Sequence, residues 1–142
     1  MKNSTKTGIL GLTFALLSFS ASAEVKVIGN SSIADSALSK DIAAKIFLGK
    51  LSKSPSGAKL VAIDQEPGEA AREEFYSKIA NKNESQLKAY WSRLIFTGKG
   101  MPPKRVLDDE EVVELVAANP ESIGYVSGDA DIAGTKVLLT MP

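Results

Sequence analysis

The 142-residue sequence contains no cysteine and no histidine. Without cysteine there is no disulfide framework and no thiolate chemistry, and without histidine a Ser-His-Asp triad and imidazole metal ligands are excluded. Seventeen basic residues balance seventeen acidic ones, so the chain lacks the basic excess of a nucleic-acid-binding protein. Aromatic residues are few, at 6%, and no spacing of carboxylates or Lys/Ser pairs favours catalysis. The sequence therefore predicts one domain that is not an enzyme, with no cofactor, metal site or nucleic-acid partner.

The first 23 residues have the pattern of a secretory signal peptide. Lys2 and Lys6 give a positive start, residues 9–17 are apolar, and residues 21–23 (Ala-Ser-Ala) form a cleavage site. The alternative, a membrane anchor, is disfavoured because the apolar run is shorter than the ~20 residues that span a bilayer. Cleavage leaves Glu24–Pro142, 119 residues with a formal charge of −2, and the predicted location is the periplasm.

Strand and helix patterns alternate along residues 24–142. The predicted strands are 24–28, 59–63, 122–126 and 136–140, and the predicted helices are 38–48, 69–80, 84–96 and 108–118. Residues 64–68 are predicted to form a turn, and residues 97–106 to be irregular because they contain two glycines and a Pro-Pro pair. Strands separated by helices predict an α/β fold, a mostly parallel sheet flanked by helices.

Three segments carry a resemblance to a known family. They are Leu38–Lys50 (LSKDIAAKIFLGK), Gln86–Pro103 (QLKAYWSRLIFTGKGMPP) and Glu121–Ser127 (ESIGYVS). Together they resemble the phosphate-type substrate-binding proteins of ABC transporters, in the type 2 periplasmic-binding superfamily, and the second segment is similar to a short, single-lobed branch. The resemblance implies one such lobe over residues 24–142, where full receptors close two lobes on a ligand.

The loop after the second predicted strand departs from the family pattern. The relatives are expected to carry an Arg-Ser-Asp-x-Ser-Gly-Thr-like loop that presents backbone N–H groups and hydroxyls to an anion. Here the matching arginine is Asp64, and the hydroxyl residues are replaced by Gly68 and Ala70. Glu69 adds a negative charge at the helix start, so the substitutions disfavour phosphate.

Two loops remain candidates for a ligand subsite, because α/β sheets bind ligands beyond the carboxyl ends of their strands. The candidate ligand residues are Asn30, Ser31, Ser32, Gln65, Gly68 and Arg72. The alternatives stay open. The first loop also fits a hydroxyl-rich turn, and the second fits a helix start capped by its own acids, with Arg72 paired to Glu69 or Glu73.

Two further groups have competing interpretations. Tyr90 and Trp91 suit stacking on a sugar or a nucleobase, but their helical spacing with Leu87 favours the core. Residues 99, 104 and 105 (Lys, Lys, Arg) suit an anionic partner, although such charge groups are usually a solvated face.

The sequence thus predicts an exported solute-binding-like protein that binds a small polar or anionic ligand without transforming it. Phosphate is a possible ligand, and an ABC transporter membrane component or another periplasmic protein is a possible partner. The alternative is a protein-interaction or scaffold module that has lost ligand binding, with self-association as one form of it.

Overall fold

A computed structural model describes residues 23–142, and the predicted signal peptide, apart from Ala23, lies outside the described residues. The elements in chain order are β1 (Val25–Asn30), α1 (Lys40–Phe47), β2 (Val61–Gln65), α2 (Ala70–Ala80), α3 (Glu84–Phe96), β3 (Lys104–Val106), α4 (Asp109–Ala118), β4 (Ser122–Ser127) and β5 (Thr135–Met141). All four predicted helices are present. Within residues 23–142, no helix has the length and apolarity needed to cross a membrane.

The five strands form one sheet in the order β3-β2-β4-β1-β5. β2 pairs in parallel with both β3 and β4, whereas β1 pairs antiparallel with both β4 and β5. Four strands therefore run in one direction and β1 runs against them. The predicted α/β fold, a sheet flanked by helices, is confirmed. The sheet is mixed, since two of its four pairings are antiparallel, and the reversed direction of β1 decides where its polar loop lies.

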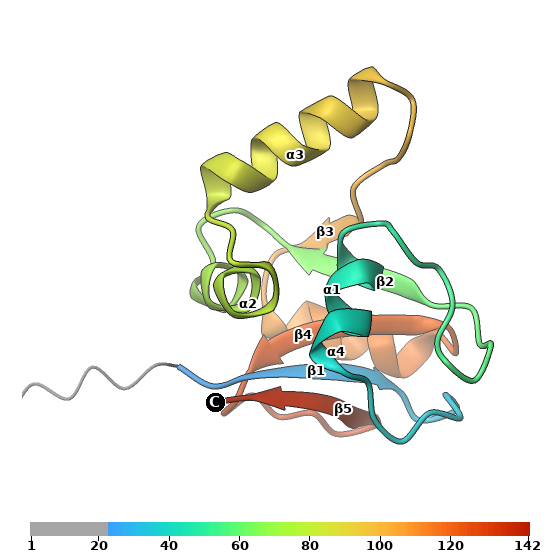
Figure 1. Ribbon diagram of the computed structural model, residues 1–142. Helices are drawn as coiled ribbons and strands as arrows, with labels where there is room; N and C mark the ends of the chain where they lie inside the picture. The colour runs from blue at the N-terminus through green and yellow to red at the C-terminus, as the bar shows by residue number, and fades with distance from the viewer. Residues whose placement is uncertain (1–22) are drawn as a thin grey trace, which may run out of the picture.

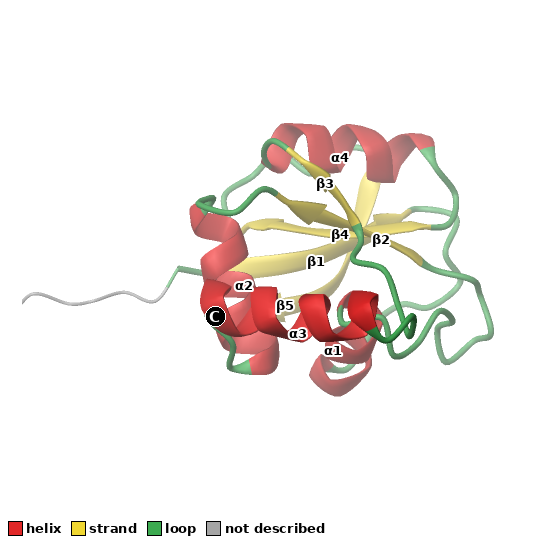
Figure 2. Ribbon diagram, turned by 90° about the horizontal axis from the view of Figure 1, so that it is seen from above, coloured by secondary structure: helices red, strands yellow, loops and turns green. Residues whose placement is uncertain are grey.

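Helices cover both faces of the sheet (Figures 1 and 2). One apolar cluster on the side of α1 and α2 includes Val27, Phe47 and Phe75, and a second cluster joins α4 to the sheet. Successive side chains of a strand point to opposite faces of the sheet, so each strand can contribute to both clusters. Val27 belongs to the first cluster and Ile28 to the second. Gly124 in β4 lets α4 approach closely, because a Cβ there would lie 2.5 Å from a methyl of Val112.

α3 lies outside the layer of α1 and α2, at the top of Figure 1. Leu87 and Trp91 are buried, the Trp91 ring lies against Gly49, and the Tyr90 hydroxyl donates to the backbone oxygen of Leu48 at 2.6 Å. The interpretation of Tyr90 and Trp91 as packing residues is therefore supported. Ile95, one helical turn after Trp91, is 49% exposed.

Side-chain caps set the starts of α1, α3 and α4. The Ser39 hydroxyl accepts from the Ile42 N–H, and Asn83 with Gln86 forms a reciprocal capping box at α3. At α4 the Asp108 carboxylate accepts from the Glu111 N–H. These local contacts explain why the helix limits follow the sequence pattern closely.

Two parts of the sequence-based assignment are wrong. Asp64 and Gln65, predicted in a turn, are the last residues of β2 and are buried. β3 lies inside the stretch predicted to be irregular, where the chain after the Pro-Pro pair adds a three-residue edge strand to β2. In addition, β1 extends two residues beyond its predicted end, through Gly29 and Asn30.

Candidate functional site

The two predicted ligand loops lie at opposite ends of the sheet. Ile123 of β4 is paired with both Gly29 near the end of β1 and Ala62 near the start of β2. Asn30 therefore lies at the end of the sheet where β2 begins, and Gln65 lies at the opposite end, where β2 finishes. The five residues from Val61 to Gln65 are four steps along a strand and span roughly 13 Å. The prediction of one pocket built from both loops is wrong, because β1 runs against its neighbours.

At the end of β1, Asn30 serves the end of α4. Its side-chain nitrogen donates to the backbone oxygens of Val116 and Ala117 at 2.8 and 3.1 Å. Its side-chain oxygen accepts from the backbone N–H and hydroxyl of Ser32 at 2.9 and 2.7 Å. Ser31 and Ser32 are exposed. Asn30 therefore uses its polar atoms internally, which supports the interpretation of this loop as a structural turn.

At the end of β2, a buried polar cluster centres on Asp64. Its carboxylate accepts from the Arg72 guanidinium and the Tyr76 hydroxyl at 2.8 Å each, and from the Tyr125 hydroxyl. The backbone N–H of Gln65 donates to it at 2.8 Å. Four donors thus satisfy a carboxylate taken from water, as burial of a charge requires.

Arg72 reaches this cluster from the first turn of α2. It is 1% exposed, and its Nε donates to the Glu84 carboxylate at 3.0 Å while its Nη1 also donates to the backbone oxygen of Gln65. The alternative in which Arg72 pairs with Glu69 or Glu73 on the surface is wrong. Asp64 and Glu84 hold the guanidinium between two carboxylates, so its charge is already compensated before any anion arrives.

The pKa values of the cluster follow from burial beside a charge. Burial, together with the negative Asp64, raises the pKa of both Tyr76 and Tyr125 well above their ordinary value, so both hydroxyls stay protonated donors. Burial lowers the pKa of Arg72, but the charge of Asp64 and the hydrogen bond to Glu84 outweigh it, and the net pKa is raised. Arg72 therefore stays charged.

Gln65 and Gly68 differ in exposure. Gln65 is fully buried, and its side-chain nitrogen donates to Asp109 at 2.8 Å and to the backbone oxygen of Tyr125 at 3.0 Å, while its side-chain oxygen has no partner within residues 23–142. Gly68 is exposed, with φ of 97° in the turn before α2. Glu69 precedes the helix without a side-chain cap, so the predicted capping by its carboxylate is absent.

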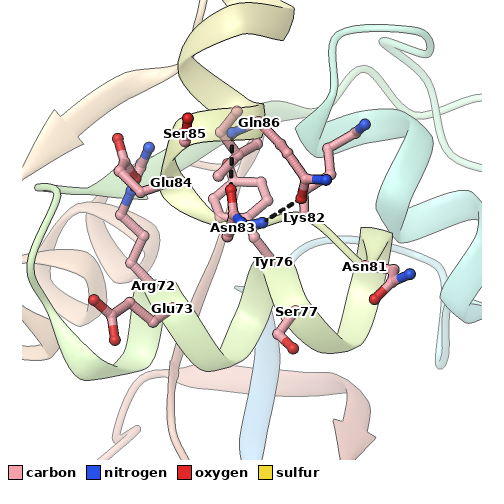
Figure 3. Close-up of a pocket in the computed structure, with 11 residues that line it drawn as sticks. Arg72, Glu73, Tyr76, Ser77, Asn81, Lys82, Asn83, Glu84, Ser85 and Gln86 are labelled. Atoms are coloured by element: carbon pink, nitrogen blue, oxygen red, sulfur yellow. Dashed lines mark hydrogen bonds and ion pairs between the residues drawn. The ribbon is translucent and has the colours of Figure 1, made fainter.

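A cavity of about 600 Å³ lies between α2 and the start of α3 (Figure 3). Its lining comprises Arg72, Glu73, Tyr76, Ser77, Asn81, Lys82, Asn83, Glu84, Ser85, Gln86 and Leu87. Two cations and two carboxylates balance within this set. The other polar lining groups include three side-chain amides and two serine hydroxyls, so the cavity is polar but carries no net charge.

The turn between the two helices brings these groups together. Asn81 ends α2 with φ of 50°, a left-handed conformation that reverses the chain, and α3 starts three residues later. The capping box uses the side-chain oxygens of Asn83 and Gln86, while their amide nitrogens donate in no hydrogen bond recorded for residues 23–142. Lys82 lies over the Tyr90 ring, with its ammonium 5.6 Å from the centroid. The cavity therefore offers neutral donors at its rim.

Sequence reasoning found Arg72 but missed its partners. Asp64 ends an apolar strand, a position where a lone carboxylate needs buried donors, and this was the available signal. Tyr76 follows Arg72 by one helical turn, a spacing that places the two side chains on one face of a helix. Tyr125 comes from β4, 61 residues from Asp64, and no local pattern indicates that contact.

Comparison with models of known protein families finds no match, and comparison with curated proteins finds none either. Solved structures do match. A protein described as a phosphate ABC transporter substrate-binding protein from Clostridium perfringens, with bound phosphate, has a TM-score of 0.63 and 17% identity. The match covers 82% of this chain and 44% of that one.

Two other receptors give the same result. An ABC-type phosphate transport receptor from Vibrio cholerae has a TM-score of 0.63 and 15% identity, and PstS from Borrelia burgdorferi has 0.62 and 17%. Each match covers 82% of this chain, and 45% and 46% of the receptors respectively. The chain has the fold of phosphate-type substrate-binding proteins, as the sequence resemblance predicts, and spans less than half of their length.

Proposed function

We propose that this chain is an exported, non-catalytic binding protein that holds a small, uncharged polar ligand in the α2–α3 cavity. The observation that carries the proposal is the balanced charge of a cavity of about 600 Å³ whose rim presents amides and hydroxyls. Ligand pockets use a few such groups to orient their ligand. The solute-binding fold supports a binding role over catalysis, and the periplasm is the proposed location.

An anion such as phosphate suits this cavity less well. Arg72 already binds two carboxylates, and an incoming anion would have to compete with Asp64 and Glu84 for it. Separating a buried ion pair leaves an uncompensated charge, which is costly. The sequence predicts a small polar or anionic ligand, and of these two classes the geometry of the cavity favours the uncharged polar one. Docking on an ABC transporter membrane component stays part of the proposal, since the matched receptors are described as transport proteins.

A thermal-shift and calorimetric panel tests the ligand class. The panel contains neutral polyols and monosaccharides on one side, and phosphate and sulfate on the other, each at millimolar concentration. We expect a neutral member to raise the melting temperature while the oxyanions do not. A response to oxyanions alone would overturn the proposed ligand class, and a flat panel would favour the scaffold alternative.

A matched pair of variants places the ligand. Ser77 and Ser36 are both exposed, and only Ser77 belongs to the lining of the α2–α3 cavity. Ser77→Trp is expected to fill the cavity and reduce ligand affinity at least tenfold, and Ser36→Trp to leave it unchanged. Equal affinities for both variants would show that the ligand binds elsewhere.

A further inference from the structure

The end of α3 and the loop after it expose three large apolar side chains. Ile95 is 49% exposed, Phe96 92% and Met101 76%. We call residues 93–101 the α3 tip. Figure 1 shows this part of the chain standing off the sheet, at the top of the view. Phe96 projects on the opposite side of the helix from Leu87, since nine residues turn a helix by about 180° beyond full turns. The tip therefore presents apolar groups that the fold does not cover.

The chain around the tip is strongly basic. Residues 85–107 contain five cations and no carboxylate, whereas the chain from residue 24 onward has a formal charge of −2. Acidic residues border this stretch at position 84 and at 108–111. The cations are Lys88, Arg93, Lys99, Lys104 and Arg105, and all are exposed. None of them makes an ion pair within residues 23–142. Uncompensated positive charge beside exposed apolar groups calls for an anionic occupant with an apolar interior.

A groove beside the tip combines the same two chemistries. It has a volume of about 720 Å³ and runs between α3, the turn before α2 and the segment before β3. Trp91, Ile95 and the pair at 102–103 (Pro-Pro) give it apolar walls. Lys88 and Arg105 belong to its lining, together with one carboxylate, Glu84, which is paired with Arg72. Apolar walls bordered by cations match a phospholipid, which joins an acyl chain to an anionic headgroup.

We propose that the α3 tip docks on the surface of an anionic lipid bilayer. Phe96 and Met101 would enter the headgroup and acyl boundary while the surrounding cations face the lipid headgroups. A bilayer can accept the exposed Phe96 side chain without a preformed pocket, whereas a protein partner would need a cavity that receives it. A two-fold dimer through this surface would set five cations against five, so a second copy is disfavoured. Docking of this kind does not require a ligand in the α2–α3 cavity.

Vesicle co-sedimentation tests the proposal on the chain as it is recovered from exporting cells, with its N-terminus read by mass spectrometry. The probes are phosphatidylcholine vesicles and vesicles with a 30% share of phosphatidylglycerol. We expect at least tenfold stronger binding to the anionic vesicles at 50 mM salt, and loss of most of that difference at 500 mM salt, where surface charges are screened.

Paired variants assign the surface. Phe96→Ser and Lys99→Glu change the tip, and each is expected to weaken vesicle binding at least fivefold. The controls are Leu107→Ser, which changes an apolar residue 64% exposed beyond β3, and Lys53→Glu, which reverses an exposed charge far from the tip in sequence. Both controls are expected to bind as the unchanged chain does, and circular dichroism checks that all four fold.

Three outcomes overturn the proposal. Equal binding to neutral and anionic vesicles removes the role of the cations, and equal loss in tip and control variants removes the role of the tip. Light scattering that shows a dimer dissolved by Phe96→Ser assigns the tip to a second copy instead. The ligand response of the α2–α3 cavity is measured separately, so failure of vesicle binding leaves the proposed function standing.

Discussion

The two ends of the sheet each bury a polar side chain, and the two side chains find their hydrogen-bond partners in different ways. At the end of β1, Asn30 satisfies two backbone carbonyls at the end of α4 through a neutral amide. At the end of β2, Asp64 brings a charge into the interior and gathers Arg72 and two tyrosines around it. Both ends looked like ligand loops in the sequence. The difference shows that the side chain at the β1 end caps one helix, whereas the ionic cluster at the β2 end connects α2 and β4 to β2.

The largest expected effect comes from removing the charge at the β2 end. Asp64→Ala leaves Arg72 buried without one of its two carboxylates and both tyrosine hydroxyls without an acceptor. Breaking a buried ion pair typically costs about 3–5 kcal/mol. Urea unfolding is expected to show a loss in this range. Asp129→Ala, at an exposed carboxylate, is the control and is expected to stay within about 0.5 kcal/mol.

A double variant sharpens that result. Asp64→Ala combined with Arg72→Met removes both members of the pair, so the uncompensated cation disappears with its partner. The double variant is expected to be more stable than Asp64→Ala alone, since apolar replacement of a buried pair is often neutral. A double variant that is less stable than the single one would show that Arg72 contributes mainly through Glu84 and Gln65.

At the β1 end the expected effect is smaller. Asn30→Ala removes the donor to the oxygens of Val116 and Ala117 and the acceptor of Ser32. Leaving buried polar groups without partners costs about 1–3 kcal/mol. Urea unfolding measures it, with the exposed neighbour Ser31→Ala as the control. A loss as large as that of Asp64→Ala would erase the distinction between the two ends.

The part of the fold that was predictable depends on local signals. α3 is present over its full predicted range because Asn83 and Gln86 cap it and Gly98 follows its end. The ends of β1 and β2 were misassigned because Asn30 and Asp64 are polar, and polar residues at strand ends resemble turns. Apart from Ser32 beside Asn30 and the Gln65 N–H beside Asp64, their partners lie at least eight residues away, and no local rule reveals such contacts. β3 was missed because three residues after a Pro-Pro pair carry no strand pattern.

The candidate site was less predictable for the same reason. From the sequence alone, Asp64 is interpreted as the replacement of an arginine that the relatives are expected to have. In the structure, Asp64 forms an ion pair with Arg72 of this chain. The reversed direction of β1 then separated the two loops, and strand direction follows from pairing across the whole sheet. The α2–α3 cavity arises where two predicted helices meet, so the helices were predictable and the cavity between them was not.

Alkaline pH distinguishes the two ends further. The raised pKa of Tyr125, caused by burial and then by Asp64, means that above pH 10.0 the unfolded chain loses this proton while the folded chain keeps it. Stability is therefore fully present below pH 10.0 and falls as pH rises, by about 1.4 kcal/mol per pH unit for one such group. Tyr125→Phe is expected to flatten this decline, as measured by urea unfolding between pH 9 and 11. An unchanged slope would contradict the role of Tyr125.

The smallest expected effect lies in the segment after β1, at acidic pH. Hydrogen bonds from the side chains of Ser54 and Ser56 lower the pKa of Asp35 below its ordinary value of 3.8. A lowered folded pKa gives stability that is present above pH 3.8 and lost as pH falls through the folded value. Asp35→Asn is expected to lower stability slightly at pH 7, with a gap that closes as the pH drops below 3.8, measured by thermal unfolding across that range. A gap that persists at pH 2 would assign the effect to packing. Closure of the gap would give the β1 side a weak sensitivity to acid, whereas the β2 end is sensitive to alkali. The reason is that the folded chain binds fewer protons than the unfolded chain at Asp35 and more at the buried tyrosines.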